Sequence, residues 1–157
     1  MSATKPLAIL IVTAVLTMLF GTLHPPYALA DDTSIVGSWV VQVFPNPPGP
    51  PPFKNLVTST RDGGNINYDP TLGAGHGVWK KVGNRMFAVK FLTLFPPGFD
   101  PPFPPETTIT VTSKSLTLNK QGDELTGPFQ TVFTHPTTGE EIASFTGTVV
   151  LTRITID

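Results

Sequence analysis

Short runs of alternating apolar and polar residues dominate the chain after residue 34. Each run is rich in Val, Ile, Thr or Phe and is bounded by Gly, Pro, Asn or Asp, which is the pattern of β-strands. No segment beyond residue 30 carries the 3.6-residue period of an amphipathic helix. The pattern predicts eight strands, over approximately residues 35–44, 54–61, 65–69, 77–82, 85–95, 107–118, 124–134 and 142–156.

The connections between these runs alternate in length. Four connections are long, at residues 45–53, 70–76, 96–106 and 135–141, and the three between them are tight turns, at 62–64, 83–84 and 119–123. In an up-and-down antiparallel sheet, odd-numbered connections lie at one end and even-numbered connections at the other. The sequence therefore predicts that all the long connections lie at one end of the sheet and all the tight turns at the other. About eight strands also close into a barrel whose interior can hold one small ligand.

Alternation within the runs predicts which side chains face the barrel interior. The run at 85–95 contributes Phe87, Val89, Phe91, Thr93 and Phe95. The runs at 124–134 and 142–156 add Leu125, Gly127, Phe129, Thr131, Phe133, Phe145, Gly147, Val149, Leu151 and Arg153. The runs at 54–61 and 65–69 add Thr58, Thr60, Ile66 and Tyr68. This interior is aromatic, with glycines and hydroxyl side chains that leave space between the rings.

The first and last runs carry a further signal. Gly37 and Trp39 form a Gly-x-Trp motif on the first, and Arg153 lies on the last. This combination resembles the lipocalins and the wider calycin barrels, in which an Arg on the last strand packs over the Trp indole. The resemblance implies an all-β, eight-stranded antiparallel up-and-down β-barrel, closed at the tight-turn end by Gly37, Trp39 and Arg153. The chain departs from the lipocalin pattern because it lacks a Thr-Asp-Tyr segment, a disulfide and a C-terminal helix.

The first thirty residues differ from the rest of the chain. Lys5 precedes a mainly apolar stretch from Leu7 to Phe20, and small residues end the segment at Ala28-Leu29-Ala30. A positive residue, an apolar stretch and an A-x-A ending are typical of a secretory signal peptide. The apolar stretch is shorter than the roughly 20 residues that a membrane-spanning helix needs. We expect residues 1–30 to be a signal peptide cleaved near Ala30, and residues 31–157 to be a single β-barrel domain. The domain is then exported to the periplasm or the extracellular space without a stable membrane anchor.

Composition excludes several classes of function. The net charge is −1 and no basic stripe is present, which argues against nucleic acid as a partner. The chain has no cysteine and three histidines without metal-ligand spacing, so we expect no thiol chemistry, no metal and no cofactor. No Gly-x-Ser-x-Gly elbow and no phosphate-binding glycine loop is present either.

Two of the long connections, 45–53 and 96–106, consist largely of proline with phenylalanine around them. Clustered apolar residues on stiff loops are typical of a binding surface, and small-molecule sites are concave and mostly apolar. The sequence therefore predicts that a small hydrophobic molecule binds at this end of the barrel. The predicted ligand-binding residues are Phe53, Tyr68, His76, Phe91, Phe95, Phe99, Phe103, Phe129 and Phe133.

Two other functions stay open at this point. Small barrels of similar architecture include the allene oxide cyclases, so a cyclase or isomerase is an alternative, with His76 and Tyr68 as catalytic residues in proton transfer. A structural or inhibitory surface protein with a filled barrel is the third. The sequence leaves open the identity of the ligand, the oligomeric state and whether the interior is open or filled.

Overall fold

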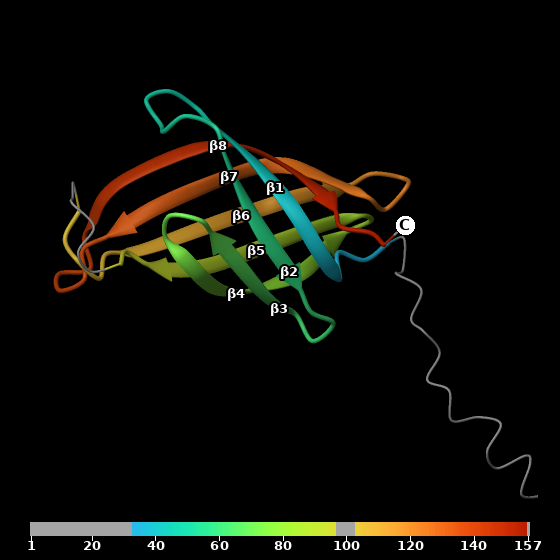
Figure 1. The fold of residues 1–157 in the computed structure, drawn as a ribbon, viewed down its shortest axis with the longest axis horizontal. Helices are drawn as coiled ribbons and strands as arrows, with labels where there is room; N and C mark the ends of the chain where they lie inside the picture. Colours follow the sequence, from blue (N-terminus) through green and yellow to red (C-terminus); the bar gives the residue numbers. More distant parts are fainter. Residues whose placement is uncertain (1–32, 97–102, 157) are drawn as a thin grey trace, which may run out of the picture.

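The computed structural model of the protein describes residues 33–96 and 103–156. These residues form a closed antiparallel barrel in which each strand pairs with its neighbours in sequence and β1 pairs with β8 (Figure 1). The strands are β1 (Gly37–Pro45), β2 (Phe53–Ser59), β3 (Gly64–Asp69), β4 (Gly73–Gly83), β5 (Met86–Leu94), β6 (Thr108–Leu118), β7 (Glu124–Thr134) and β8 (Glu141–Arg153). The predicted all-β, up-and-down barrel is confirmed. The predicted signal peptide lies outside the described residues. Within the described ranges, no helix is long and apolar enough to cross a membrane.

The observed strands match the predicted runs closely, except at the start of β4. The sequence predicts a loop over residues 70–76, whereas β4 begins at Gly73. Glycines normally weaken a strand, which is why the pattern indicates a loop. Here they permit a close approach of β4 to β5: a Cβ added to Gly77 would overlap the Lys90 carbonyl oxygen and lie 2.5 Å from the Phe91 Cα.

The first and last strands close the barrel at the tight-turn end. Trp39 pairs with Arg153 in the β1–β8 register, and Arg153 Cζ lies 4.2 Å from the centroid of the Trp39 ring. The guanidinium also donates three hydrogen bonds of 2.7 Å, to the carbonyls of Gly122, Val36 and Ser34. Trp39 is fully buried and its Nε1 donates to the Ile35 carbonyl. The predicted stacking of Arg153 on Trp39 is therefore present.

Gly37 completes this closed end. Its φ is +134°, a conformation that L side chains rarely adopt, and a Cβ there would lie 2.9 Å from Arg153 Nη1. The glycine of the Gly-x-Trp motif therefore leaves room for the guanidinium.

The predicted interior faces of β5, β7 and β8 are correct. Their inward positions are buried or half-buried, among them Phe87, Phe95, Leu125, Phe129 and Leu151. A hydrophobic core around Trp39 lies inside the barrel.

The prediction for β2 and β3 is wrong by one residue. Thr58, Ile66 and Tyr68 are exposed and Thr60 lies just beyond the end of β2, whereas the buried positions are Val57, Ser59, Asn65, Asn67 and Asp69. The reason lies in the register. Trp39 pairs with Val57 and Val57 pairs with Asn67, which places these residues on the inner face of the wall. The apolar Ile66 and Tyr68 consequently face outward.

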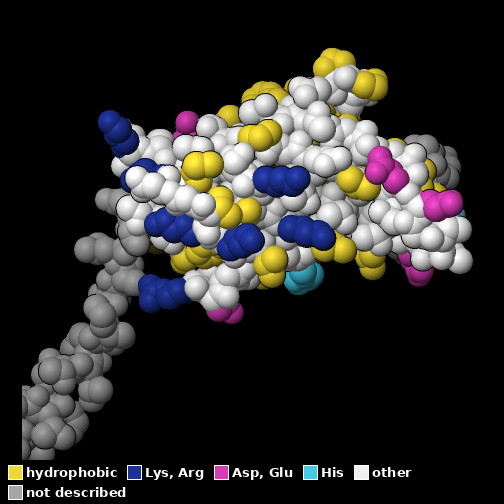
Figure 2. Space-filling view, turned by 180° about the vertical axis from the view of Figure 1, so that it is seen from behind, with side chains coloured by type: hydrophobic (Ala, Val, Ile, Leu, Met, Phe, Trp, Pro, Cys, Tyr) yellow, Lys and Arg dark blue, Asp and Glu magenta, His cyan; other side chains and the backbone are white. Residues whose placement is uncertain are grey.

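Charged side chains are unevenly distributed on the outer surface. Figure 2 shows Lys and Arg side chains spread over the body of one face, and a group of Asp and Glu side chains at the end formed by the long connections. Glu106, Glu140 and Glu141 are exposed in or beside those connections. The open end is therefore acidic beside the β5–β6 and β7–β8 connections, while Lys54 lies at the same end on β2.

Candidate functional site

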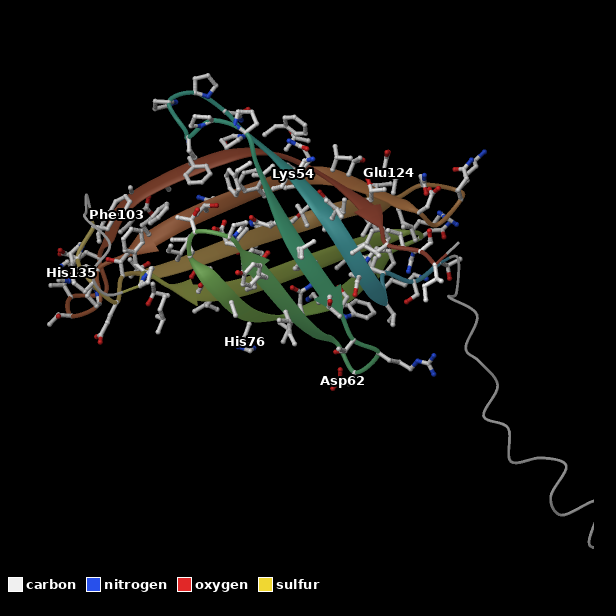
Figure 3. The ribbon with its side chains drawn as sticks, in the orientation of Figure 1. Lys54, Asp62, His76, Phe103, Glu124 and His135 are labelled. Carbon is white, nitrogen blue, oxygen red and sulfur yellow. The ribbon has the colours of Figure 1, made fainter. Side chains whose placement is uncertain are left out.

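A large pocket opens among the long connections. Its volume is about 920 Å³, and it is lined by the 48–52 loop, the turn between β3 and β4, and the mouth-end residues of β2, β7 and β8. We call it the mouth pocket. Its phenylalanines are Phe53, Phe95, Phe103, Phe133 and Phe145. Figure 3 shows Phe103 at this end of the barrel, opposite the end that carries Asp62 and Glu124.

The phenylalanine side chains pack into a continuous aromatic wall. The rings of Phe103 and Phe133 stack with their centroids 4.5 Å apart, and Phe95 meets Phe103 edge to face at 5.9 Å. Phe145 contacts both Phe133 and Phe129, with centroids 6.0 and 5.9 Å apart. These are favourable aromatic geometries, so the wall is held in place before any ligand arrives.

A second, smaller space lies deeper in the barrel. This inner cavity has a volume of about 80 Å³. Phe53 lines both spaces, and on β7 the inward residues Phe129 and Thr131 line the inner cavity while Phe133 lines the mouth pocket. The two spaces thus follow one another along the barrel, with the mouth pocket outermost.

The β2–β3 wall of the inner cavity carries several polar side chains, beside Phe53 and Val57. Asn55, Ser59, Asn65 and Asn67 all line it. Asn65 Nδ2 donates to Ser59 Oγ at 3.1 Å. With its amide oriented to satisfy both of its polar atoms, Asn55 donates from Nδ2 to Asp69 Oδ2 at 3.0 Å and to the Lys54 carbonyl at 2.8 Å.

Asp69 lies at the boundary between this wall and the mouth pocket. Its Oδ1 accepts hydrogen bonds from the backbone amides of Thr71 and Leu72, at 2.7 and 2.9 Å. Together with the bond from Asn55, these contacts occupy both carboxylate oxygens. Asp69 therefore shapes the β3–β4 turn at the rim.

The structure separates the predicted site residues into three groups. Phe53, Phe95, Phe103 and Phe133 line the mouth pocket, and Phe91 and Phe129 line the inner cavity. Tyr68 and His76 lie on the outer surface: Tyr68 is 52% exposed, and His76 is exposed between Ile66 and Leu92 on the neighbouring strands. In Figure 3 the His76 side chain points away from the barrel. Phe99 lies outside the described residues.

Tyr68 and His76 therefore face neither space, because the inner face of their strands belongs to the residues at odd-numbered positions. The predicted set of ligand-binding residues also omits Phe145 and the amide side chains of the β2–β3 wall. The alternation of Asn65, Asn67 and Asp69 with apolar residues could have identified that wall. Asparagine is usually exposed, so the pattern favours the opposite face.

Lys54 and Asp69 are the ionisable residues among those that line the mouth pocket, and no described ionisable residue lines the inner cavity. No group of three or more His, Asp or Glu among the described residues could hold a metal ion. The hydrogen bond from the Thr60 hydroxyl, followed by that from the Gly64 amide, lowers the pKa of Asp62 below its ordinary value. Asp62 lies in the turn between β2 and β3, at the closed end, so this shift does not affect the mouth pocket.

Comparison of the chain with protein-family models, curated proteins and solved structures finds no match. A pocket of about 920 Å³ is large enough for a small organic molecule, and its phenylalanines and prolines offer an apolar surface.

Proposed function

We propose that this protein is an exported, lipocalin-like barrel that binds a small hydrophobic molecule at its open end. The observation that carries the proposal is the mouth pocket, with its five phenylalanines and its proline loop, directly above the inner cavity. The stacking of Arg153 on Trp39 supports the lipocalin resemblance, and the pattern of residues 1–30 supports export.

Apolar burial supplies the binding energy in this proposal. A ligand that buries about 300 Å² of apolar surface gains roughly 7 kcal/mol before the cost of association is subtracted. Proline fixes its own φ, and the phenylalanines already pack against one another, so few torsions have to be ordered on binding. A preformed pocket of this kind retains more of the burial energy as affinity.

A neutral fluorescent probe, N-phenyl-1-naphthylamine, tests the proposal by titration. We expect saturable binding to the wild type. Affinity should fall about tenfold or more in Phe133→Ala, which removes a wall residue, and in Ala143→Trp, which places an indole inside the mouth pocket; tenfold corresponds to about 1.4 kcal/mol.

The matched control is Phe44→Ala, because Phe44 is 42% exposed and does not line the mouth pocket. This variant should bind the probe as the wild type does. Far-UV circular dichroism checks that each variant is folded. Absence of saturable binding to the wild type, or wild-type affinity in both Phe133→Ala and Ala143→Trp, would reject the mouth pocket as the binding site.

A further inference from the structure

The inner cavity contains a polar atom that an entirely apolar ligand would leave unpaired. Asn65 is 2% exposed, and its Nδ2 is used by the hydrogen bond to Ser59. Its Oδ1 is buried and has no hydrogen-bond partner among the described residues. A buried acceptor without a partner costs about 1–3 kcal/mol. A ligand that donates a hydrogen bond to this oxygen recovers that energy.

Asn65 belongs to a polar wall that faces an apolar one. Asn67, also 2% exposed, follows it on the inner face of β3, and both line the cavity. Across the cavity, Val89, Val111 and Phe129 supply apolar side chains. The inner cavity is thus two-sided: its β2–β3 wall carries the amide side chains, and the opposite side is mainly apolar, with the hydroxyls of Ser113 and Thr131.

The size and position of the inner cavity limit which part of a ligand can contact Asn65. One water needs about 10–15 Å³ of such space, so 80 Å³ accommodates a small polar group and the first atoms attached to it. The remainder of the ligand must then extend past Phe53 into the mouth pocket.

Charge further restricts the polar group. No described Lys or Arg lines the inner cavity, and the free atom of Asn65 is an acceptor. A carboxylate there would face an oxygen without a counter-charge and would lose its hydration. These features favour a neutral donor.

We propose that the ligand is amphipathic and binds with its polar end innermost: a neutral hydroxyl or N–H group donates to Asn65 Oδ1, and the apolar body lies among the phenylalanines of the mouth pocket. This inference rests on the proposed function, since it assumes that an apolar molecule occupies the mouth pocket. It adds the chemical class and the orientation of that molecule.

Three probes with the same ten-carbon chain test the inference: 1-decanol, its methyl ether and decanoate. Their dissociation constants are measured by displacement of N-phenyl-1-naphthylamine. We expect the wild type to bind 1-decanol about tenfold more tightly than the ether, which cannot donate a hydrogen bond, and more tightly than decanoate. In Asn65→Leu, which removes the acceptor but keeps the branching of the side chain, the alcohol and the ether should bind equally.

Asn84→Leu is the matched control, because it makes the same substitution at an exposed position that lines neither space. It should keep the preference for the alcohol. If Asn65→Leu does not fold, the preference of the wild type for the alcohol over the ether still decides the question.

The outcomes separate the two proposals. Equal binding of the alcohol and the ether by the wild type, tighter binding of decanoate, or an unchanged preference in Asn65→Leu would overturn the orientation while the mouth pocket stands. Failure of the naphthylamine and of all three probes to bind would instead reject the proposed function.

Discussion

At the scale of single residues, the closed end shows how one side chain can join distant parts of the chain. Arg153 packs on Trp39 and donates to carbonyls that precede β1 and to one in the β6–β7 turn. The sequence was sufficient to predict the stacking, because it depends on two residues at recognisable positions. The three carbonyl partners depend on how the backbone is folded, and no pattern in the sequence identifies them.

Replacement of Arg153 by Met should lower the free energy of unfolding by at least about 3 kcal/mol. A hydrogen bond to a charged group contributes about 1.5–3 kcal/mol and a cation over an indole about 0.5–2 kcal/mol, and these contributions overlap. Arg153→Lys keeps the charge but loses the planar fork, so its loss should be intermediate. Urea unfolding measures the free energy of unfolding of the wild type and of both variants. A change of less than 0.5 kcal/mol in Arg153→Met, the range of ordinary surface substitutions, would contradict the structural role of Arg153.

The asparagines of β3, in contrast, are residues whose orientation the sequence predicted incorrectly. Composition and alternation predict that Asn65 and Asn67 face solvent, yet both are buried. Their orientation follows from pairing with β2, whose register is set in turn by Trp39 on β1. A preference of single residues for the surface is outweighed when the register of a neighbouring strand determines the face.

At the scale of elements, β4 is unusual because its inner face at the open half carries only glycine. Gly73, Gly75 and Gly77 occupy successive inward positions opposite Asp69, Asn67 and Asn65. The backbone of β5 lies against Gly75 and Gly77 so closely that a side chain has no room there. From the sequence alone, these glycines indicated a loop. Their actual role, a close approach of two paired strands, depends on tertiary structure and could not be predicted from local pattern.

Gly77→Ala should therefore destabilise the protein by about 2–3 kcal/mol, since the new methyl group meets backbone atoms that cannot rotate away. Gly83→Ala is the control on the same strand: its Cβ would make an ordinary 3.4 Å contact with the Met86 side chain. That variant should stay within about 0.5 kcal/mol of the wild type. Thermal and urea unfolding of the pair provide the comparison, and equal stabilities would show that β4 and β5 can separate at Gly77 at little cost.

At the scale of the whole molecule, the alternation of long and short connections was the most reliable sequence signal. It requires only that neighbouring strands pair in order, and the observed pairing follows that order around the barrel. The location of the mouth pocket was predictable for the same reason. Its detailed lining was only partly predictable, because the faces of β2 and β3 depend on long-range register.

A closed ring of strands has no edge at which unfolding can begin independently, so we expect a single cooperative transition. Trp39 and Trp79 report on the packed core, and the far-UV circular dichroism reports on all strands together. In urea, the fluorescence and circular dichroism curves should superimpose with one midpoint. Two separate midpoints would indicate that part of the barrel opens while the remainder stays folded.

The pairing of Trp39 with Arg153 has a practical consequence for how the barrel can be handled. Because β1 starts and β8 ends at the closed end of the barrel, anything fused before residue 33 or after residue 156 is attached at that end. A bead or sensor chip coupled directly before residue 33 or after residue 156 would attach at the closed end and leave the entrance turned toward the solution. The same geometry allows a reporter domain to be attached next to residue 33 or residue 156 without obstructing access to the pocket.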